Sequence, residues 1–263
     1  MDAQSSLLNV SLIELAALWR DFAWVLIRSS AMVLAMPAVG SRIFPAKGRI
    51  IIILALASVT YISGVSLPDQ DPVSLPGLFV VIQEFLIGLT MGFVVQLLFN
   101  VFIVGGEAFA MQMGLGFASL VDTERGVQVP MVAQMYVIFT TLLFFAMDGH
   151  LALFRLLMTS YTTLPIGEGL PLGQLEGILE LGNWMYSSAV RVALPAMAAL
   201  LVVNLAFGIM ARAAPQLNII AVGFPVTLML GFVVMLFTLP LLMPLFYEFY
   251  TDVLTFNTQL VTP

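Results

Sequence analysis

The chain has 263 residues, of which 61% are apolar or aromatic (Ala, Val, Ile, Leu, Met, Phe, Trp, Tyr) and only 9% are charged. A soluble globular domain carries about 25% charged residues, so this composition excludes an ordinary soluble protein and indicates an integral membrane protein. The net charge of −6 comes without a large cluster of Lys and Arg, which excludes nucleic-acid binding. Cysteine is absent and histidine occurs once, which excludes disulfides, thiol catalysis and Cys- or His-rich metal sites.

Six hydrophobic segments approach or exceed the roughly 20 apolar residues that a helix needs to cross a bilayer. They are residues 22–39, 50–67, 77–104, 131–147, 184–211 and 219–247, and a shorter helix-like piece lies at 151–158. We therefore expect an all-α membrane protein with about six hydrophobic helices. Prolines within these segments predict kinked helices, because proline removes a backbone hydrogen bond. These prolines are Pro37, Pro195, Pro225, Pro240 and Pro244.

The basic residues predict the orientation of these segments in the membrane. Most Lys and Arg residues between the segments fall in the loops at 40–49, 105–130 and 212–218, whereas the alternate loops are mainly acidic. Cytoplasmic loops are enriched in Lys and Arg. We therefore expect these three loops to be cytoplasmic and both chain ends to lie on the opposite side.

The third segment carries polar and small residues at every fourth position. Because a helix has 3.6 residues per turn, this stripe winds slowly around the helix. Glycines spaced as GxxxG let two membrane helices approach closely, so we interpret the stripe as a packing surface within the chain or between subunits. An ion or solute path is the alternative, since an intramembrane carboxylate is usually functional. The stripe consists of Glu84, Gly88, Gly92, Gln96 and Asn100.

Two arginines, Arg28 and Arg191, fall inside apolar segments. A charge in the bilayer centre is unfavourable, so each must reach the membrane surface, pair with an acid on a neighbouring subunit, or lie outside the lipid. The sequence leaves these three possibilities open.

The loop at 105–130 contains a run in which bulky and small or polar residues alternate. Alternation with a period of two indicates extended chain with two unlike faces. Extended chain is tolerated in a membrane protein only where it is buried or lines an aqueous cavity, and a hydrophobic constriction can close a pore. The alternative is a helical extension, which the glycines Gly105, Gly106, Gly114 and Gly116 disfavour. The bulky residues are Phe109, Met111, Met113, Leu115 and Phe117.

Catalytic signatures are missing from the sequence. It contains no phosphate-binding P-loop, no HExxH and no GxSxG motif. His150 follows Asp148 at the end of the fourth segment, where a polar turn at the membrane surface is the simpler interpretation. We therefore expect a protein that is not an enzyme and that has no cofactor and no metal.

Three blocks of sequence carry a resemblance to a known family. The first is Gly106-Glu107-Ala108 with Gln112-Met113-Gly114-Leu115, Ala118 and Asp122. The second is Phe144-Phe145 with Gly149-His150, Ser160 and Leu164-Pro165, and the third is Arg212-Ala213-Ala214-Pro215-Gln216-Leu217-Asn218 with Gly223-Phe224-Pro225. In this order they resemble the FliR/SctT family, the R-type subunits of flagellar and virulence type III export gates. The chain departs from that family at Thr123, where proline is frequent, and at Leu151, where a second histidine is common.

The resemblance implies a subunit that assembles with FliP and FliQ in the bacterial inner membrane, within the flagellar basal body. FlhB and FlhA belong to the same machine, and unfolded axial proteins pass through it. Residues 1–183 would be FliP-like, with a plug loop at 105–122, and residues 184–263 would form a FliQ-like hairpin and tail. The resemblance places the pore plug at Phe109, Met111, Met113, Leu115 and Phe117, supported by Gly106, Glu107, Gln112, Gly114 and Asp122. The packing or subunit-interface residues would be Glu84, Gly88, Gly92, Gln96, Asn100, Arg191, Arg212, Pro215, Gln216 and Asn218.

Three alternatives to a flagellar gate subunit stay open. One is an injectisome gate subunit of the same family. Another is a small-molecule secondary transporter that uses Glu84, Gln96 and Asn100, although the sequence lacks the inverted repeats common in transporters. The third is an inert membrane scaffold that only nucleates assembly.

Overall fold

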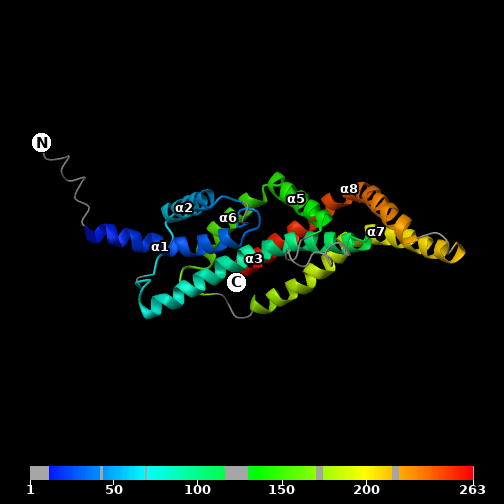
Figure 1. The fold of residues 1–263 in the computed structure, drawn as a ribbon. Helices are drawn as coiled ribbons and strands as arrows, with labels where there is room; N and C mark the ends of the chain where they lie inside the picture. Colours follow the sequence, from blue (N-terminus) through cyan, green and yellow to red (C-terminus); the bar gives the residue numbers. More distant parts are fainter. Residues whose placement is uncertain are drawn as a thin grey trace. The chain divides into compact units, whose positions relative to one another are not determined.

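The computed structural model describes residues 12–41, 44–68, 70–115, 130–169, 174–214 and 219–262. Throughout these residues the regular structure is helical, which confirms the expected all-α fold (Figure 1). The helices are α1 (Leu12–Ala35), α2 (Ala46–Ile62), α3 (Leu75–Gln112), α5 (Met131–Ala146), α6 (Gly149–Thr163), α7 (Gln174–Ala213) and α8 (Ile219–Val261).

Each of the six hydrophobic segments corresponds to one helix, and α6 covers the shorter apolar piece at 151–158. Pro195 lies inside α7, and Pro225, Pro240 and Pro244 lie inside α8, as expected. The expectation for Pro37 was wrong, because α1 ends at Ala35 and the proline lies in the turn that follows. The helical conformation is sterically disfavoured for the residue that precedes a proline. This explains why α1 ends before Pro37 and does not continue through it with a kink.

Within the described ranges, three helices are long and apolar enough to cross a membrane: Leu75–Gln112, Glu180–Ala213 and Gly223–Val261. The pair α5 and α6, bent by 62°, passes the same criterion if it counts as one broken span. The 17-residue helix α2 is shorter than a typical span, and α1 carries several charged residues. The expectation that both chain ends lie on the same side of the membrane requires an even number of crossings. It is met only if the bent pair α5 and α6 forms one span, which makes four.

The chain forms two compact units that interleave along the sequence. The first comprises Met1–Gln96, His150–Glu176 and Leu254–Pro263, and its core contains the large buried side chains of Trp24, Met32, Ile87 and Met91. The predicted boundary at residue 183 separates a FliP-like part from a FliQ-like part. The two compact units do not test such a resemblance, so this boundary stays a prediction.

The second unit comprises Leu97–Gly149 and Gly177–Val253, and its core is rich in phenylalanine. Phe102 on α3 lies 5.8 Å from Phe246 and 6.2 Å from Phe249 on α8, measured between ring centroids. Trp184 on α7 meets Phe249 edge-on at 5.9 Å. Edge-to-face aromatic pairs add to the free energy gained by burial, so these rings hold the end of α3 against the α7–α8 pair.

Candidate functional site

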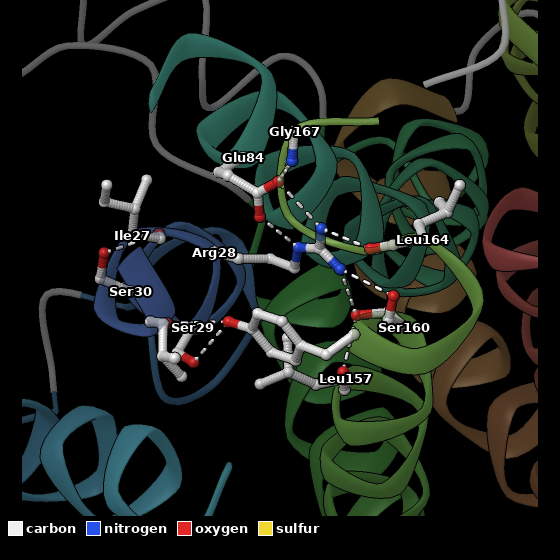
Figure 2. A network of polar contacts seen from close by, with 11 residues as sticks. Ile27, Arg28, Ser29, Ser30, Glu84, Leu157, Ser160, Leu164 and Gly167 are labelled. Atoms are coloured by element: carbon white, nitrogen blue, oxygen red, sulfur yellow. Dashed lines mark hydrogen bonds and ion pairs between the residues drawn. The ribbon is translucent and has the colours of Figure 1, made fainter. Parts of the chain in front are cut away.

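The most polar place inside the first unit is an ion pair between Arg28 of α1 and Glu84 of α3 (Figure 2). The Arg28 Nε donates to Glu84 Oε2 at 2.7 Å and its Nη2 donates to Oε1 at 3.0 Å. Neither side chain is exposed to solvent. Because a buried guanidinium is stabilised only when its charge and its N–H groups are all matched, the remaining donors decide whether this arrangement is complete.

The remaining donors of Arg28 bind α6 and the turn that follows it. Its Nη1 donates to the carbonyl oxygen of Ser160 at 2.8 Å and to the hydroxyl of the same residue at 3.1 Å. Its Nη2 donates to the carbonyl oxygen of Leu164 at 2.9 Å. The guanidinium also lies over the Tyr161 ring, 4.4 Å from the centroid. With two bonds to Glu84 and three to this segment, Arg28 has as many hydrogen bonds as it has N–H groups.

The cluster joins three helices and one turn of the same unit. Tyr161 extends it, because its hydroxyl donates to the carbonyl oxygen of Val25 at 2.8 Å and lies 3.2 Å from Ser29 Oγ. The backbone N–H of Gly167 lies 3.4 Å from Glu84 Oε1. These contacts fix α1 against α3 and α6. A solute cannot reach the Glu84 carboxylate in this state, so the geometry gives no support to Glu84 as a transport site.

The two glycines of the stripe on α3 also meet α1. A Cβ added at Gly88 would meet the carbonyl oxygen of Arg28, and one at Gly92 would lie 2.7 Å from the carbonyl oxygen of Met32. The absence of side chains at the two glycines therefore permits α1 and α3 to approach closely. Gln96 and Asn100, further along the stripe, are half-buried.

The start of the loop at 105–130 is helical, not extended. Helix α3 continues to Gln112, so the interpretation of Phe109–Gln112 as extended chain was wrong, and the alternation there has no structural meaning. In a helix, residues four apart share a face, which explains why Phe109 and Met113 are both buried while Met111 is 65% exposed. Leu115 is half-buried, and Phe117 and Asp122 lie outside the described residues.

Gly105 and Gly106 do not break α3, although their helix propensity suggested that they would. A Cβ at Gly105 would lie 3.0 Å from Val192 Cγ1 of α7, and one at Gly106 would lie 2.9 Å from the Cα of Ala133 in α5. A glycine lowers helix stability by only about 1 kcal/mol, which close packing on two sides outweighs. Glu107 and Gln112 are half-buried on the same part of the helix.

Met113 anchors the end of α3 on α8. Its side chain fills the space above Gly231, where an added Cβ would lie 2.5 Å from Met113 Cε. The next residue, Gly114, has a φ of +87°, a left-handed conformation that glycine adopts readily. A Cβ at Gly114 would lie 3.2 Å from the ring of Phe224, also on α8. The chain therefore leaves α3 at a fixed point.

The predicted interface residues of the C-terminal part lie on α7 or just after it. Arg191 pairs with Glu248 of α8 in the same chain, through two bonds of 2.9 Å that remain half-exposed. Arg212 is exposed in the last turn of α7. Pro215, Gln216 and Asn218 lie outside the described residues.

Sequence reasoning missed that Arg28 and Glu84 are partners. Both had been singled out as charges in apolar segments, but for separate explanations. The signal was their opposite sign, because two uncompensated charges in neighbouring hydrophobic helices neutralise each other most simply by pairing. Within the described residues, no group of three or more His, Cys, Asp or Glu side chains could hold a metal ion.

Comparison with known proteins agrees with the earlier resemblance. Residues 19–253 match the model of a family described as "Bacterial export proteins, family 1". The chain is 33% identical over 243 residues to the flagellar biosynthetic protein FliR of Escherichia coli (strain K12), a match that covers 91% of this chain and 92% of the relative. It is 27% identical over 223 residues to FliR of Bacillus subtilis (strain 168), covering 83% and 86%. With FliR of Caulobacter vibrioides it shares 30% identity over 211 residues, covering 80% and 84%.

Proposed function

Because this chain belongs to the bacterial export proteins, family 1, we propose that it is a non-enzymatic subunit of the flagellar type III protein export gate. The observation that carries the proposal is the match to flagellar FliR proteins over nearly the whole of both chains. Helices long and apolar enough to span a membrane accompany this match. The flagellar names of these relatives favour the flagellar over the injectisome alternative.

In this proposal the chain assembles with FliP and FliQ into a pore for unfolded axial proteins, in the inner membrane part of the flagellar basal body. FlhB and FlhA are its further partners. Residues 1–183 take the place of a FliP-like protomer and residues 184–263 that of a FliQ-like hairpin. Large apolar side chains that remain exposed on α3 support an assembly. Surfaces of this kind need lipid or protein to cover them.

Burial supports a division of roles within the proposed plug. Phe109 and Met113 are buried in their own unit, so they hold the plug in place rather than contact the pore. Met111 is exposed and takes no part in this anchor. We assign the sealing role to the segment that follows Leu115, which includes Phe117 and ends near Asp122.

Co-purification tests the assembly. A tagged copy of this chain, produced with the FliP and FliQ proteins of the same organism, should purify as one stable complex of defined mass. A chain that elutes alone, while FliP and FliQ associate with each other, contradicts the proposal.

Ion leakage tests the seal. We expect deletion of residues 116–122 to make cells permeable to ions and small solutes, because the anchor at Phe109 and Met113 stays intact while the segment beyond it is lost. The Met111→Ala variant is the control for a nearby change outside the deleted segment. An assembled complex that carries the deletion and shows no added leakage contradicts a sealing role.

A further inference from the structure

The charged residues of α7 and α8 divide this helix pair into a charge-free part and a charged part. On α7, residues 192–211 contain no Asp, Glu, Lys or Arg, and this stretch lies directly between Arg191 and Arg212. On α8, residues 219–247 are likewise free of charge, and Glu248 follows immediately. Both helices therefore have a long charge-free stretch toward the turn that joins them.

The charge-free stretch of α7 has the length of a bilayer core. It contains 20 residues, and at about 1.5 Å per residue it spans roughly 30 Å, the typical thickness of the hydrocarbon region. The helical segments that qualify as spans, Glu180–Ala213 with 34 residues and Gly223–Val261 with 39, are longer than a bilayer requires. Length and hydropathy alone therefore do not show which part lies in lipid, whereas the charges do.

The first charges on the two helices lie at the same level. Arg191 and Glu248 form a two-bond ion pair, and further from the turn Trp184 Nε1 donates to Asp252 Oδ2 at 3.0 Å. These two contacts show that the helices run antiparallel. The ion pair is about half-exposed on both sides, at 51% and 49%. A half-exposed charged pair is unfavourable in hydrocarbon and favourable at the water–lipid boundary, where long side chains reach the headgroups.

Aromatic side chains lie beside this ion pair. Tyr186 on α7 and Tyr247 on α8 are each 62% exposed. Tyr247 directly precedes Glu248, and Tyr186 lies about one and a half turns from Arg191. Tyrosine and tryptophan concentrate at membrane–water interfaces, because their rings are amphipathic. The two exposed tyrosines therefore lie close to the level of the ion pair.

Between the ion pair and the turn, the surface of both helices is apolar and largely uncovered by the rest of the unit. The large side chains of this belt that are more than 60% exposed include Leu201, Val202, Leu205, Met229, Leu236 and Phe237. Monomeric soluble proteins rarely expose a continuous apolar surface of this extent. Along α7 this apolar surface is as long as the bilayer core is thick. This match favours lipid, and not a protein partner, as the material that covers the surface.

The charges also differ between the two ends of the belt. The turn end carries Arg212, which is exposed, and no acid lies between residues 192 and 247. Beyond the ion pair the charged residues are mainly acidic and include Glu180 and Asp252. Of the two arginines that border the belt, Arg191 is neutralised by Glu248. Because basic residues are enriched on the cytoplasmic side of a membrane, this difference favours a cytoplasmic position for the Arg212 end.

We infer that bilayer hydrocarbon covers α7 at residues 192–211 together with the charge-free stretch of α8. The Arg191–Glu248 pair lies at one water–lipid boundary and Arg212 at the other. The Arg212 end faces the cytoplasm, and the parts of α7 and α8 beyond the ion pair extend into the aqueous space on the opposite side. This inference specifies a lipid-facing surface, and it does not depend on which proteins the gate exports.

Cysteine labelling in cells tests the boundaries, because the chain has no cysteine of its own. Three single variants are compared in the assembled gate: Tyr186→Cys and Leu205→Cys, at positions with 62% and 65% exposure, and Ala213→Cys in the exposed last turn of α7. A small membrane-impermeant maleimide needs water and a thiolate. We expect Tyr186→Cys to react in intact cells, Ala213→Cys to react only after permeabilisation, and Leu205→Cys to react at least about tenfold more slowly in both conditions.

A spin label on Leu205→Cys distinguishes lipid from protein as the cover. In gates reconstituted into phospholipid vesicles, a label in hydrocarbon collides readily with oxygen and hardly with a water-soluble nickel complex. We expect this pattern. A label shielded from both reagents means that a partner protein covers the belt and overturns the inference, as does rapid maleimide labelling at Leu205→Cys. Labelling of Ala213→Cys in intact cells overturns the orientation. Motility of each variant reports separately whether export is intact.

Discussion

Arg28 and Glu84, 56 positions apart in the sequence, form a two-bond ion pair that is completely shielded from solvent. The pair joins α1 to α3, and the remaining donors of Arg28 join both helices to α6. A buried pair of this kind adds little net free energy compared with apolar residues of the same size, but either charge alone is strongly destabilising. The pair therefore makes the packing of α1 depend on the correct position of α3.

The first prediction concerns the loss of one charge or of both. Arg28→Met or Glu84→Leu alone should destabilise the protein by about 3–5 kcal/mol, because the partner stays buried without a counter-charge. The double variant Arg28→Met with Glu84→Leu should recover most of that loss. The measurement is the thermal unfolding midpoint of the purified gate complex, supported by the amount of the chain in membranes.

The pair Arg191–Glu248 supplies a control with the same residue types at a half-exposed position. Arg191→Met with Glu248→Leu should leave the midpoint close to that of the unchanged protein, since exposed ion pairs contribute little. A double variant at Arg28 and Glu84 that is as unstable as either single variant would show that the charges are required individually.

The second prediction concerns the close contact of α1 and α3 at Gly92. A Cβ at this position would lie 2.7 Å from the carbonyl oxygen of Met32 and 2.5 Å from the Cβ of Ala35. Gly92→Ala should therefore destabilise the protein by about 1–3 kcal/mol, because the two helix backbones must separate. The thermal midpoint of the purified gate measures this effect.

Gly182→Ala is the matched control, because no atom of the described part of the chain lies within 4 Å of a Cβ added there. It should leave stability unchanged or raise it by up to about 1 kcal/mol, as alanine favours helix. Equal effects of the two substitutions would mean that α1 does not approach α3 as closely as described.

The third prediction concerns the anchor formed by Met113 on Gly231. Met113→Ala should destabilise by about 2–5 kcal/mol through the cavity that it leaves. Gly231→Ala should also destabilise, because the new methyl group meets the Met113 side chain. Since the two changes compensate in volume, the double variant should lose less than the sum of the single variants. Thermal midpoints of the four proteins complete the cycle.

Met111→Ala is the control for this cycle, because Met111 is 65% exposed and two positions away. It should change the midpoint little. If the proposed seal depends on the anchor, Met113→Ala should also increase ion leakage while Met111→Ala does not. Strict additivity in the cycle would mean that Met113 does not pack on Gly231.

Most of the fold followed from hydropathy. Each of the six apolar segments proved to be a helix, because a run of some 20 apolar residues can satisfy its backbone in an apolar environment only as helix. The ends of the helices were less accurate. Helix α8 continues to Val261, well past the expected end near residue 247, and two charged residues beyond that end, Glu248 and Asp252, have partners on α7. Such long-range pairing is invisible in a window of hydropathy.

The end of α3 shows why local patterns misled the prediction of the site. Alternation of large and small residues from Phe109 suggested extended chain, and two glycines suggested a helix break. In the structure Gly105 and Gly106 are contact points for α7 and α5, a role that depends on tertiary packing. The sequence pointed to the correct segment but not to its conformation, because a period of two over a few residues does not exclude a helix.

The last prediction concerns Asn257 on α8, a fully buried side chain whose Oδ1 and Nδ2 have no hydrogen-bond partner among the residues that the structure describes. An unsatisfied buried polar group lowers stability by about 1–3 kcal/mol. Asn257→Leu should therefore leave the thermal midpoint unchanged or raise it, whereas Asn257→Asp should lower it strongly by burying a charge. Asn183→Leu, at an exposed position of α7, should have little effect. If Asn257→Leu destabilises as much as Asn257→Asp does, the carboxamide has a partner in the assembled gate that the isolated chain lacks.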